Sequence, residues 1–424
     1  EVRVSFLRLV EKILRNLVGR KNLDEDKQIK IISSIFCEFQ HEIDQVIICA
    51  VGELLYNISE YLPLNTLQNL EHSYIDPGFS CNTSGRRKSI VYLSSFSARN
   101  SVFDHFKLET ITKSFTKSFV WNSSNGSADK CAHYYKKLIT IFEFAMRIDS
   151  TDLLLIISRA LARIRCSSRG EFYLTQPKNV DGISAALGRN KNLESGIQKH
   201  VWSFPEELDY IPPELLERIN KNVRFKQQQD VTVSSVSIDI SLWLSLALQI
   251  IDHPSDWEIY SYMLTFLCPQ VSNVALFKGY YHLIEAFREM ICKHLIEGVP
   301  SSLSLPKDLY KGNLHVVYVR NLSPILAYHC YLPKQSSDEL VNALLHGLRS
   351  WEKPLIPVFH ILTVCCYEIP SSIKKFLTPI LTQLQTRITS SFVIPTILEF
   401  ILALSDSPDI ISHLTVEEFK RVFA

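Results

Sequence analysis

The sequence predicts an all-α protein: an α-solenoid of HEAT- or armadillo-like helical repeats with an irregular central insert. Three observations support this prediction. Apolar residues recur at three- and four-residue steps along most of the chain, which is the spacing of one helix face. Glycine is scarce, with 13 in 424 residues, where average usage would give roughly 30. Apolar residues make up 46% of the chain, enough for paired helices with short joints to bury a continuous core.

Residues 1–166 are expected to hold solenoid helices interrupted by one surface loop. The loop lies near 73–101, where Asp76-Pro77-Gly78 and a serine-rich run break the helical pattern. Gly19 supplies a stop signal for the first helix. The expected helices are Val2–Val18, Asp24–Phe39, Ile43–Leu62, one from about Asn65, Phe103–Phe119, Lys130–Arg147 and Ser150–Arg165.

Residues 167–230 form the predicted insert, which is polar and irregular. Prolines and four glycines interrupt any regular period there. A short helix is expected at Pro213–Asn222, because proline suits the first helical position. Just after the insert, Val231–Ile240 alternates briefly as a strand would, whereas the apolar period favours a helix over Ser235–Ile251.

Residues 231–424 are expected to return to solenoid repeats. Pro324, Pro379 and Pro395 fall within helical patterns, so each should kink its helix or lie in the first turn. Three capping boxes predict helix starts, because in each a serine or threonine oxygen accepts an amide hydrogen while a glutamate reaches back. The boxes are Ser255–Glu258, Ser336–Glu339 and Thr415–Glu418.

Leu344 and Leu398 are both assigned to buried helix faces. Aspartate at either position is expected to unravel the C-terminal repeats, because a charge would enter the core. The longest apolar stretches, near Ile240–Ile251 and Phe392–Leu404, are too short to span a membrane. They are predicted to be buried helices, and no membrane insertion is expected.

Charge and cysteine usage favour a cytoplasmic protein without nucleic acid as a partner. The net charge of +1 gives no electrostatic reason for bulk binding to nucleic acid or anionic membranes. The ten cysteines include no C-x-x-C pair, so buried reduced thiols are expected rather than disulfides or metal ligands. The chain begins at Glu1 inside an amphipathic pattern, which predicts a segment of a longer protein without a signal peptide.

The search for catalytic, cofactor-binding and metal-binding motifs predicts none. Gly85–Ser89 lacks the glycine spacing of a phosphate-binding loop. Ser114–Lys117 matches S-x-x-K without its partner motifs and is expected on the exposed edge of a helix. Each of two histidine–glutamate pairs could ligate a metal from one helix face, but about 18 Å would separate them along one helix. His282–Glu285 and His294–Glu297 are therefore expected to be ordinary surface pairs.

Two serines are candidate phosphorylation sites. Ser89 follows Arg86-Arg87-Lys88 in the predicted loop, and Ser168 ends an R-x-R-x-x-S motif that begins at Arg163. A phosphate would add about −1.5 to −2 charges at either place and could recruit or dismiss a partner. The alternative is solvated charge around Ser89 and a charged helix end before Ser168.

The order of helical segments in the last third resembles one known family. Asn313–Gly347 and Pro357–Ala424 are similar to the middle region of the tuberin family, the GTPase-activating subunits of tuberous sclerosis complexes. Trp257 in HPSDWEIYSYMLTFLC fits that family's SDW helix start, and His329 in ILAYHCYLPK fits its SYHNYL turn. The resemblance is strongest over Ser237–Ala424.

The resemblance also extends to Glu1–Leu62, whereas the central insert matches poorly. It implies a HEAT-like solenoid that binds the hamartin coiled coil. It also implies a separate C-terminal domain that stimulates GTP hydrolysis by the small GTPase Rheb and so restrains TOR signalling. Nothing in this chain matches that domain, so no catalytic residue is expected and the segment is not predicted to be an enzyme.

The predicted function is a non-catalytic scaffold. It would hold the GTPase-activating domain in register with hamartin and with a second copy of the complex, in the cytoplasm or at the lysosomal or vacuolar surface. One alternative is a generic HEAT or armadillo adaptor for an extended peptide, which would carry an asparagine or arginine ladder that this sequence does not show. The other is GTPase activation by the segment itself, which would require a positioned Asn, Gln or Arg on a mixed α/β core.

Overall fold

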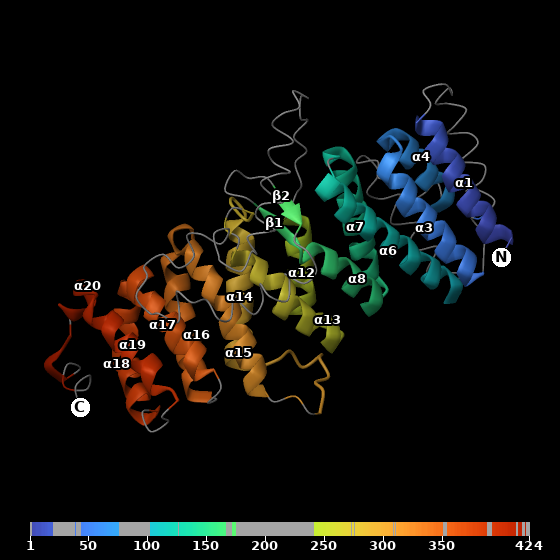
Figure 1. The fold of residues 1–424 in the computed structure, drawn as a ribbon. Helices are drawn as coiled ribbons and strands as arrows, with labels where there is room; N and C mark the ends of the chain where they lie inside the picture. Colours follow the sequence, from blue (N-terminus) through green and yellow to red (C-terminus); the bar gives the residue numbers. More distant parts are fainter. Residues whose placement is uncertain are drawn as a thin grey trace, which may run out of the picture. The chain divides into compact units, whose positions relative to one another are not determined.

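The computed structural model describes residues 2–19, 39, 44–75, 102–125, 127–166, 172–174 and 241–420, the last range with short gaps at 273, 275, 308, 310, 351–353, 388–391, 413 and 418–419. All of the helix expected at Asp24–Phe39 except Phe39, most of the 73–101 loop and most of the 167–230 insert therefore lie outside the described residues. The chain divides into two compact units, Glu1–Leu161 with Val231–Asp239, and Ala162–Asp230 with Ile240–Ala424. Figure 1 shows both units as ribbons.

Unit 1 is a stack of helices in which each packs against its neighbours. α3 packs between α1 and α6, and α6 packs in turn against α7 and α8. Their apolar faces form the core, including the fully buried Val51, Ile58 and Phe119. A described helix lies at each predicted position, although α6 continues to Asn125 and α8 ends early: α1 (Val2–Gly19), α3 (Gln45–Tyr61), α4 (Leu64–Ile75), α6 (Val102–Asn125), α7 (Ala128–Arg147) and α8 (Thr151–Leu161).

Local sequence explains where α3 begins and ends. The Asp44 carboxylate accepts a hydrogen bond from the amide of Val46 at 2.8 Å, which satisfies an otherwise unpaired donor at the helix N-terminus. The helix ends at Tyr61, and the extended residue Leu62 follows. Pro63 disfavours helical backbone at the preceding residue, so the end falls where the sequence predicted it.

The predicted helix Ser150–Arg165 is too long at its C-terminal end. α8 stops at Leu161, and unit 2 begins with a two-stranded antiparallel hairpin of β1 (Ile164–Cys166) and β2 (Phe172–Leu174). Ile164 pairs with Leu174, and Arg165 pairs with Tyr173. The β-branched and aromatic residues on these two segments suit a strand pair, and this pairing overrides the helical period that the sequence suggested.

Unit 2 consists mainly of helices that follow one another along the unit (Figure 1). α12, α14, α16, α18 and α20 pack in sequence as one row, and α15, α17 and α19 pack as a second row against it. This is the two-layer arrangement expected of an α-solenoid. The elements are α12 (Ser241–Asp252), α13 (Trp257–Tyr262), the π-helical turn η2 (Met263–Leu267), the 3₁₀ turn η3 (Cys268–Ser272), α14 (Tyr281–Glu297), α15 (Lys311–Leu322), the 3₁₀ helix η4 (Ser323–Tyr331), α16 (Lys334–Ser350), α17 (Leu355–Glu368), α18 (Pro370–Arg387), α19 (Ile394–Ser405) and α20 (Pro408–Ile411).

Two of the predicted capping boxes differ from the structure. α13 is capped by Asp256 rather than Ser255, because the Asp256 Oδ1 accepts from the amides of Glu258 and Ile259 at 2.7 and 3.3 Å. α16 begins at Lys334, directly after Pro333, so Ser336 lies within its first turn and does not precede the helix. The third box, Thr415–Glu418, lies partly outside the described residues.

The three prolines occupy the positions that proline tolerates or disrupts. Pro324 and Pro395 lie in the first turns of η4 and α19, where the missing amide hydrogen costs nothing. Pro379 lies inside α18, where it removes one backbone hydrogen bond.

The core of unit 2 contains Leu344 but not Leu398. Leu344 on α16 is fully buried, as predicted, whereas 59% of Leu398 on α19 is exposed. Leu402 is also exposed, so α19 presents an apolar stripe outward while Ile397 and Phe400 face the core. The assignment of Leu398 to a buried face is therefore wrong, because a nearly continuous apolar run does not show which side of its helix faces the neighbours.

Candidate functional site

The two candidate phosphorylation sites remain predictions. Ser89 and Ser168 both lie outside the residues that the structure describes, as does Gly85–Ser89 as a whole.

Ser114 lies in a helix contact and not on an exposed helix edge. Only 5% of it is exposed, and its Oγ donates a hydrogen bond to the backbone oxygen of Gly52 at 2.8 Å. A Cβ at Gly52 would lie 2.7 Å from Thr110 Cγ2 and 2.9 Å from Ser114 Oγ. The glycine therefore allows α3 and α6 to approach closely, and Ser114 has a structural role in that contact.

In each histidine–glutamate pair one residue is exposed, His282 and Glu297, and the other lies in a contact between helices. His294 is 3% exposed, and its Nδ1 lies 3.1 Å from the hydroxyl of Tyr260, which lies 2.7 Å from the hydroxyl of Tyr318. Burial is the main cause that lowers the pKa of His294 to about 4, with a smaller contribution from the charge of Lys293. His294 is thus a neutral core residue that links α13, α14 and α15.

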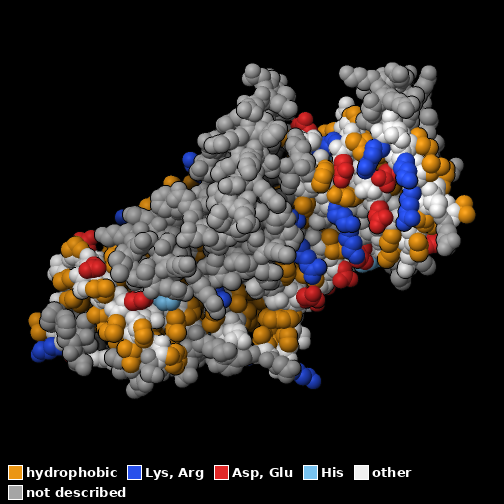
Figure 2. Space-filling view, viewed as in Figure 1, with side chains coloured by type: hydrophobic (Ala, Val, Ile, Leu, Met, Phe, Trp, Pro, Cys, Tyr) orange, Lys and Arg blue, Asp and Glu red, His pale blue; other side chains and the backbone are white. Residues whose placement is uncertain are grey.

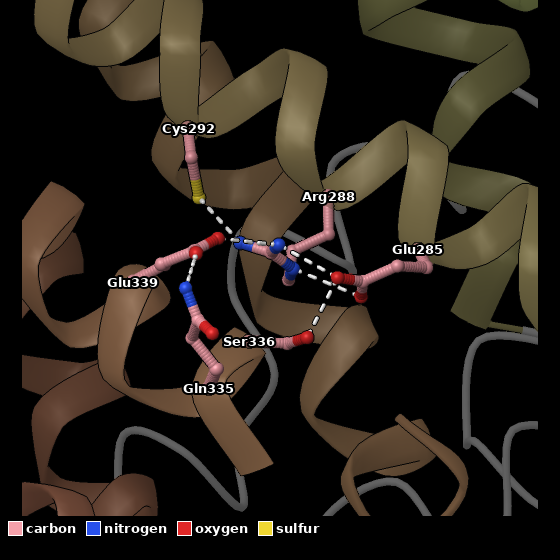
Figure 3. A network of polar contacts seen from close by, with 6 residues as sticks. All are labelled: Glu285, Arg288, Cys292, Gln335, Ser336 and Glu339. Atoms are coloured by element: carbon pink, nitrogen blue, oxygen red, sulfur yellow. Dashed lines mark hydrogen bonds and ion pairs between the residues drawn. The ribbon is translucent and has the colours of Figure 1, made fainter. Parts of the chain in front are cut away.

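Glu285 belongs to a polar network that joins α14 to α16 (Figure 3). At its centre is Arg288, which is 2% exposed. Its Nε and Nη2 donate to Glu285 at 3.0 and 2.7 Å, and Nη2 also donates to Glu339 of α16 at 2.7 Å. Ser336 Oγ donates to Glu285 at 2.6 Å, and Gln335 Nε2 donates to Glu339 at 3.0 Å. Arg288 Nη1 lies 3.8 Å from Cys292 Sγ. We call Glu285, Arg288, Cys292, Gln335, Ser336 and Glu339 the Arg288 network.

The electrostatics of the Arg288 network favour the fully charged state. Burial by itself would raise the pKa of Glu285, but the hydrogen bonds from Arg288 and Ser336 outweigh it and leave that pKa below its ordinary value. Burial would lower the pKa of Arg288, but the hydrogen bond to Glu285 and the neighbouring charges raise it instead. A buried guanidinium with two carboxylate partners is the paired arrangement that a buried charge requires.

Unit 2 carries a second polar link, from α16 to α18. The Asp338 carboxylate accepts hydrogen bonds from Ser372 Oγ and Lys375 Nζ at 2.7 and 2.5 Å. Burial opposes them, but these hydrogen bonds hold the pKa of Asp338 below its ordinary value. Together with the Arg288 network, this link connects three successive helices of one row through side chains.

Unit 1 has its own buried polar contacts. His133 Nε2 of α7 lies 2.7 Å from Glu71 Oε2 of α4, and Lys137 Nζ lies 3.7 Å from the same oxygen. Lys130 Nζ donates to the backbone oxygen of Ser59 at 2.8 Å, and burial lowers the pKa of Lys130. As in unit 2, the polar groups join neighbouring helices and do not line a reaction site.

The described surface carries mixed charges. On the face shown in Figure 2, acidic and basic side chains are interspersed over the unit 1 helices. Within the described ranges, no group of three or more His, Cys, Asp or Glu side chains is placed to hold a metal ion. Among the helices that the structure describes, none combines the length and the apolar composition needed to cross a membrane. The packed helices, linked by polar contacts, can present a surface of fixed shape.

Comparison with known proteins identifies the family. The family model described as Tuberin matches residues 209–424, just over half of the chain. This chain belongs to the tuberin family. The matched range contains both segments, Asn313–Gly347 and Pro357–Ala424, on which the resemblance rested, and that prediction is confirmed. The match also includes residues 209–230 of the predicted insert, whereas the resemblance at Glu1–Leu62 lies outside it.

A curated relative gives the same result. The Tuberous sclerosis 2 protein homolog of Schizosaccharomyces pombe is 29% identical over 228 residues, which are 54% of this chain and 16% of that protein. The chain thus corresponds to about a sixth of the length of that relative. The α12–α20 repeats and the Arg288 network lie within the range of the family match.

The sequence contained a signal for the Arg288 network, but its partner was misassigned. Both Ser336 and Glu339 of the predicted box form hydrogen bonds, but their partners are Glu285 and Arg288 of α14 and not the backbone of α16. The i, i+3 spacing of Glu285 and Arg288 marked a pair on one helix face. Their burial against α16 could not be read from that spacing.

Proposed function

We propose that this chain is a non-catalytic scaffold segment of a tuberin-like GTPase-activating protein, and that it supports assembly with hamartin. Two findings support the proposal: membership of the tuberin family and two rows of helices packed in sequence. The observation that carries most weight is the Arg288 network, because a buried charged contact between successive repeats fixes their relative register. A fixed register gives the row an exposed surface of defined shape, which is what a scaffold supplies.

In this proposal the GTPase-activating step belongs to another part of the parent protein. Stimulating GTP hydrolysis by Rheb requires a side chain that orients water or stabilises transition-state charge at the nucleotide. The polar groups described in both units are instead engaged between helices. The segment would contribute to the restraint of TOR signalling by holding the complex together, in the cytoplasm or at a lysosomal or vacuolar surface.

Hamartin's coiled coil is the proposed partner, and a second copy of the complex is a further one. Binding would use helix ridges of the solenoid, with a few buried aromatic or arginine anchors contributing most of the free energy. Exposed apolar side chains on α19, Leu398 and Leu402, are the kind of surface such contacts use. Neither is needed for the core, so both can be changed without unfolding the chain.

Size-exclusion chromatography with light scattering tests the proposal. The 424-residue chain is run alone, mixed with recombinant hamartin coiled coil, and mixed with an unrelated coiled coil of similar length as a control. We expect a stable complex with hamartin alone, with a mass equal to the sum of defined copies of both chains. Separate elution of the folded chain and hamartin, or equal binding to the control, would overturn the assignment of hamartin binding to this segment.

A further inference from the structure

One exposed cysteine has a histidine beside its sulfur. Cys330 lies near the C-terminal end of η4 and is exposed. Its Sγ lies 3.1 Å from Nε2 of His329. A nucleophile and a base within hydrogen-bond reach, with the base oriented by a third group, is the arrangement that activates a thiol.

The neighbours of His329 determine which of its ring nitrogens carries the hydrogen. Nδ1 lies 2.8 Å from the backbone oxygen of Leu326. A carbonyl oxygen can only accept, so Nδ1 carries a hydrogen and donates it. In the neutral ring Nε2 then has the free lone pair, and this is the nitrogen that faces Cys330. His329 is therefore held in the tautomer that can take a proton from the thiol.

The carboxylate of Glu368 lies near the His329 ring, on the side of Nδ1. Glu368 Oε2, near the end of α17, lies 3.7 Å from Nδ1 of His329. When Nε2 accepts the thiol proton, the ring becomes positively charged, and Glu368 and the Leu326 carbonyl both stabilise that charge. The third group that the activated-thiol arrangement requires is thus supplied by another helix of the same unit.

The other described cysteines lack this combination of exposure and base. Burial raises the pKa of Cys268, Cys292, Cys365 and Cys366, that of Cys292 to about 12. Cys49 on α3 is exposed as well and offers an internal comparison. Among these thiols, Cys330 alone is both exposed and in hydrogen-bond contact with a histidine.

We propose that Cys330 is a nucleophilic thiol and the site where small electrophiles, hydrogen peroxide among them, modify this chain. The Sγ proton passes to His329 Nε2, and the thiolate attacks one peroxide oxygen. An S–O bond forms while the O–O bond breaks, and the leaving hydroxide takes the proton from Nε2 and departs as water. The sulfur is oxidised to a sulfenic acid and the peroxide is reduced, so the sum is one thiol and one peroxide to one sulfenic acid and one water.

The position gives such a change a structural consequence. The next residue, Tyr331, stacks on Tyr281 of α14 with ring centroids 4.3 Å apart, and its own surface is largely exposed. An adduct on Cys330 would add volume and polar or charged atoms beside the Tyr331–Tyr281 ring pair. The modified face would then differ in shape from the unmodified one for any partner that contacts η4 and α14.

Competitive alkylation of the intact 424-residue chain tests the proposal. The folded protein is treated with a limiting amount of iodoacetamide at pH 7, and peptide mass spectrometry gives the relative alkylation rates of Cys330 and Cys49. We expect Cys330 to react about tenfold faster, because His329 Nε2 is placed to accept its proton as the sulfur attacks, whereas the comparison rests on Cys49 as an exposed thiol of unit 1. The His329→Gln variant should bring Cys330 down to the rate of Cys49.

A pH profile and a matched control separate activation from simple exposure. The pH dependence of Cys330 alkylation should differ between the parent chain and His329→Gln, because only the parent chain has a base in contact with the thiol. His253→Gln removes an exposed histidine elsewhere in unit 2 and should leave the Cys330 profile unchanged. Treatment with hydrogen peroxide and a sulfenic-acid probe should label the parent chain and not the Cys330→Ser variant. Equal rates at Cys330 and Cys49, or a profile unaltered by His329→Gln in a folded variant, would overturn the proposal.

Discussion

Replacing Glu285 by glutamine tests whether the Arg288 network holds the repeats of unit 2 together. The substitution keeps the size of the side chain and removes its charge. Arg288 stays charged, because a guanidinium does not deprotonate in proteins, and it is 2% exposed. Its remaining ionic partner is Glu339, whose side chain is 45% exposed and whose attraction is therefore screened by water.

The magnitude follows from what the change leaves behind. Breaking a buried ion pair by removing one partner costs about 3–5 kcal/mol, because a charge remains uncompensated. Glu339 still compensates part of it, so we expect a loss of about 3 kcal/mol in the free energy of unfolding of unit 2. For a unit of this size, such a loss lowers the melting temperature by about 6–12 °C.

Thermal unfolding followed by circular dichroism and calorimetry measures the effect. Glu289→Gln is the matched control, since Glu289 lies on the same helix and is exposed, and its change should stay within about 0.5 kcal/mol. In the double variant Glu285→Leu with Arg288→Met, both charges are replaced by apolar groups, and much of the lost stability should return. If Glu285→Gln melted together with Glu289→Gln, the Arg288 network would not hold α14 to α16 and the reasoning would fail.

Two further predictions concern burial and pH. Leu344→Asp should cost more than about 4 kcal/mol and abolish the cooperative transition of unit 2, whereas Leu398→Asp should change stability by less than about 1 kcal/mol; similar melting curves for the two variants would contradict the assigned faces. Burial is the main cause that lowers the pKa values of His294 and His315 to about 4, so the unfolded chain binds more protons between about pH 6.5 and 4, and stability is lost as the pH falls through that window. Each histidine accounts for up to about 3 kcal/mol of this loss of stability. His294→Gln should reduce the difference in melting temperature between pH 7 and pH 5. The variant His253→Gln, at an exposed site, should leave that difference unchanged.

Much of the fold could be predicted because it depends on local spacing. The apolar period of Val2–Val18 and Ile43–Leu62 placed α1 and α3 to within two residues, and Pro63 marked the end of α3. Where long-range packing decides, the same reasoning failed. Ile164–Cys166 forms a strand because it pairs with Phe172–Leu174. The spacing of apolar residues within Ile164–Cys166 did not indicate that pairing.

The polar contacts were harder to predict than the helices. Ser114, Ser336 and His294 each stood in a recognisable local pattern, yet each is buried and bonded to a residue distant in sequence. A short motif gives the chemical type of a side chain and the face it occupies. Which helix packs against that face depends on how the repeats stack. The spacing of residues within one helix does not predict this.

The side-chain links along α14, α16 and α18 have a mechanical consequence. Sliding one helix along its neighbour by a single residue moves it about 1.5 Å, enough to break the 2.6–2.7 Å bonds between Glu285 and Ser336 and between Arg288 and Glu339. Apolar side chains could exchange contacts during such a slide at little cost, because dispersion has no direction. This row of helices should therefore resist shear more strongly than bending, and a load applied at one end of the row would be transmitted along it without a change of register.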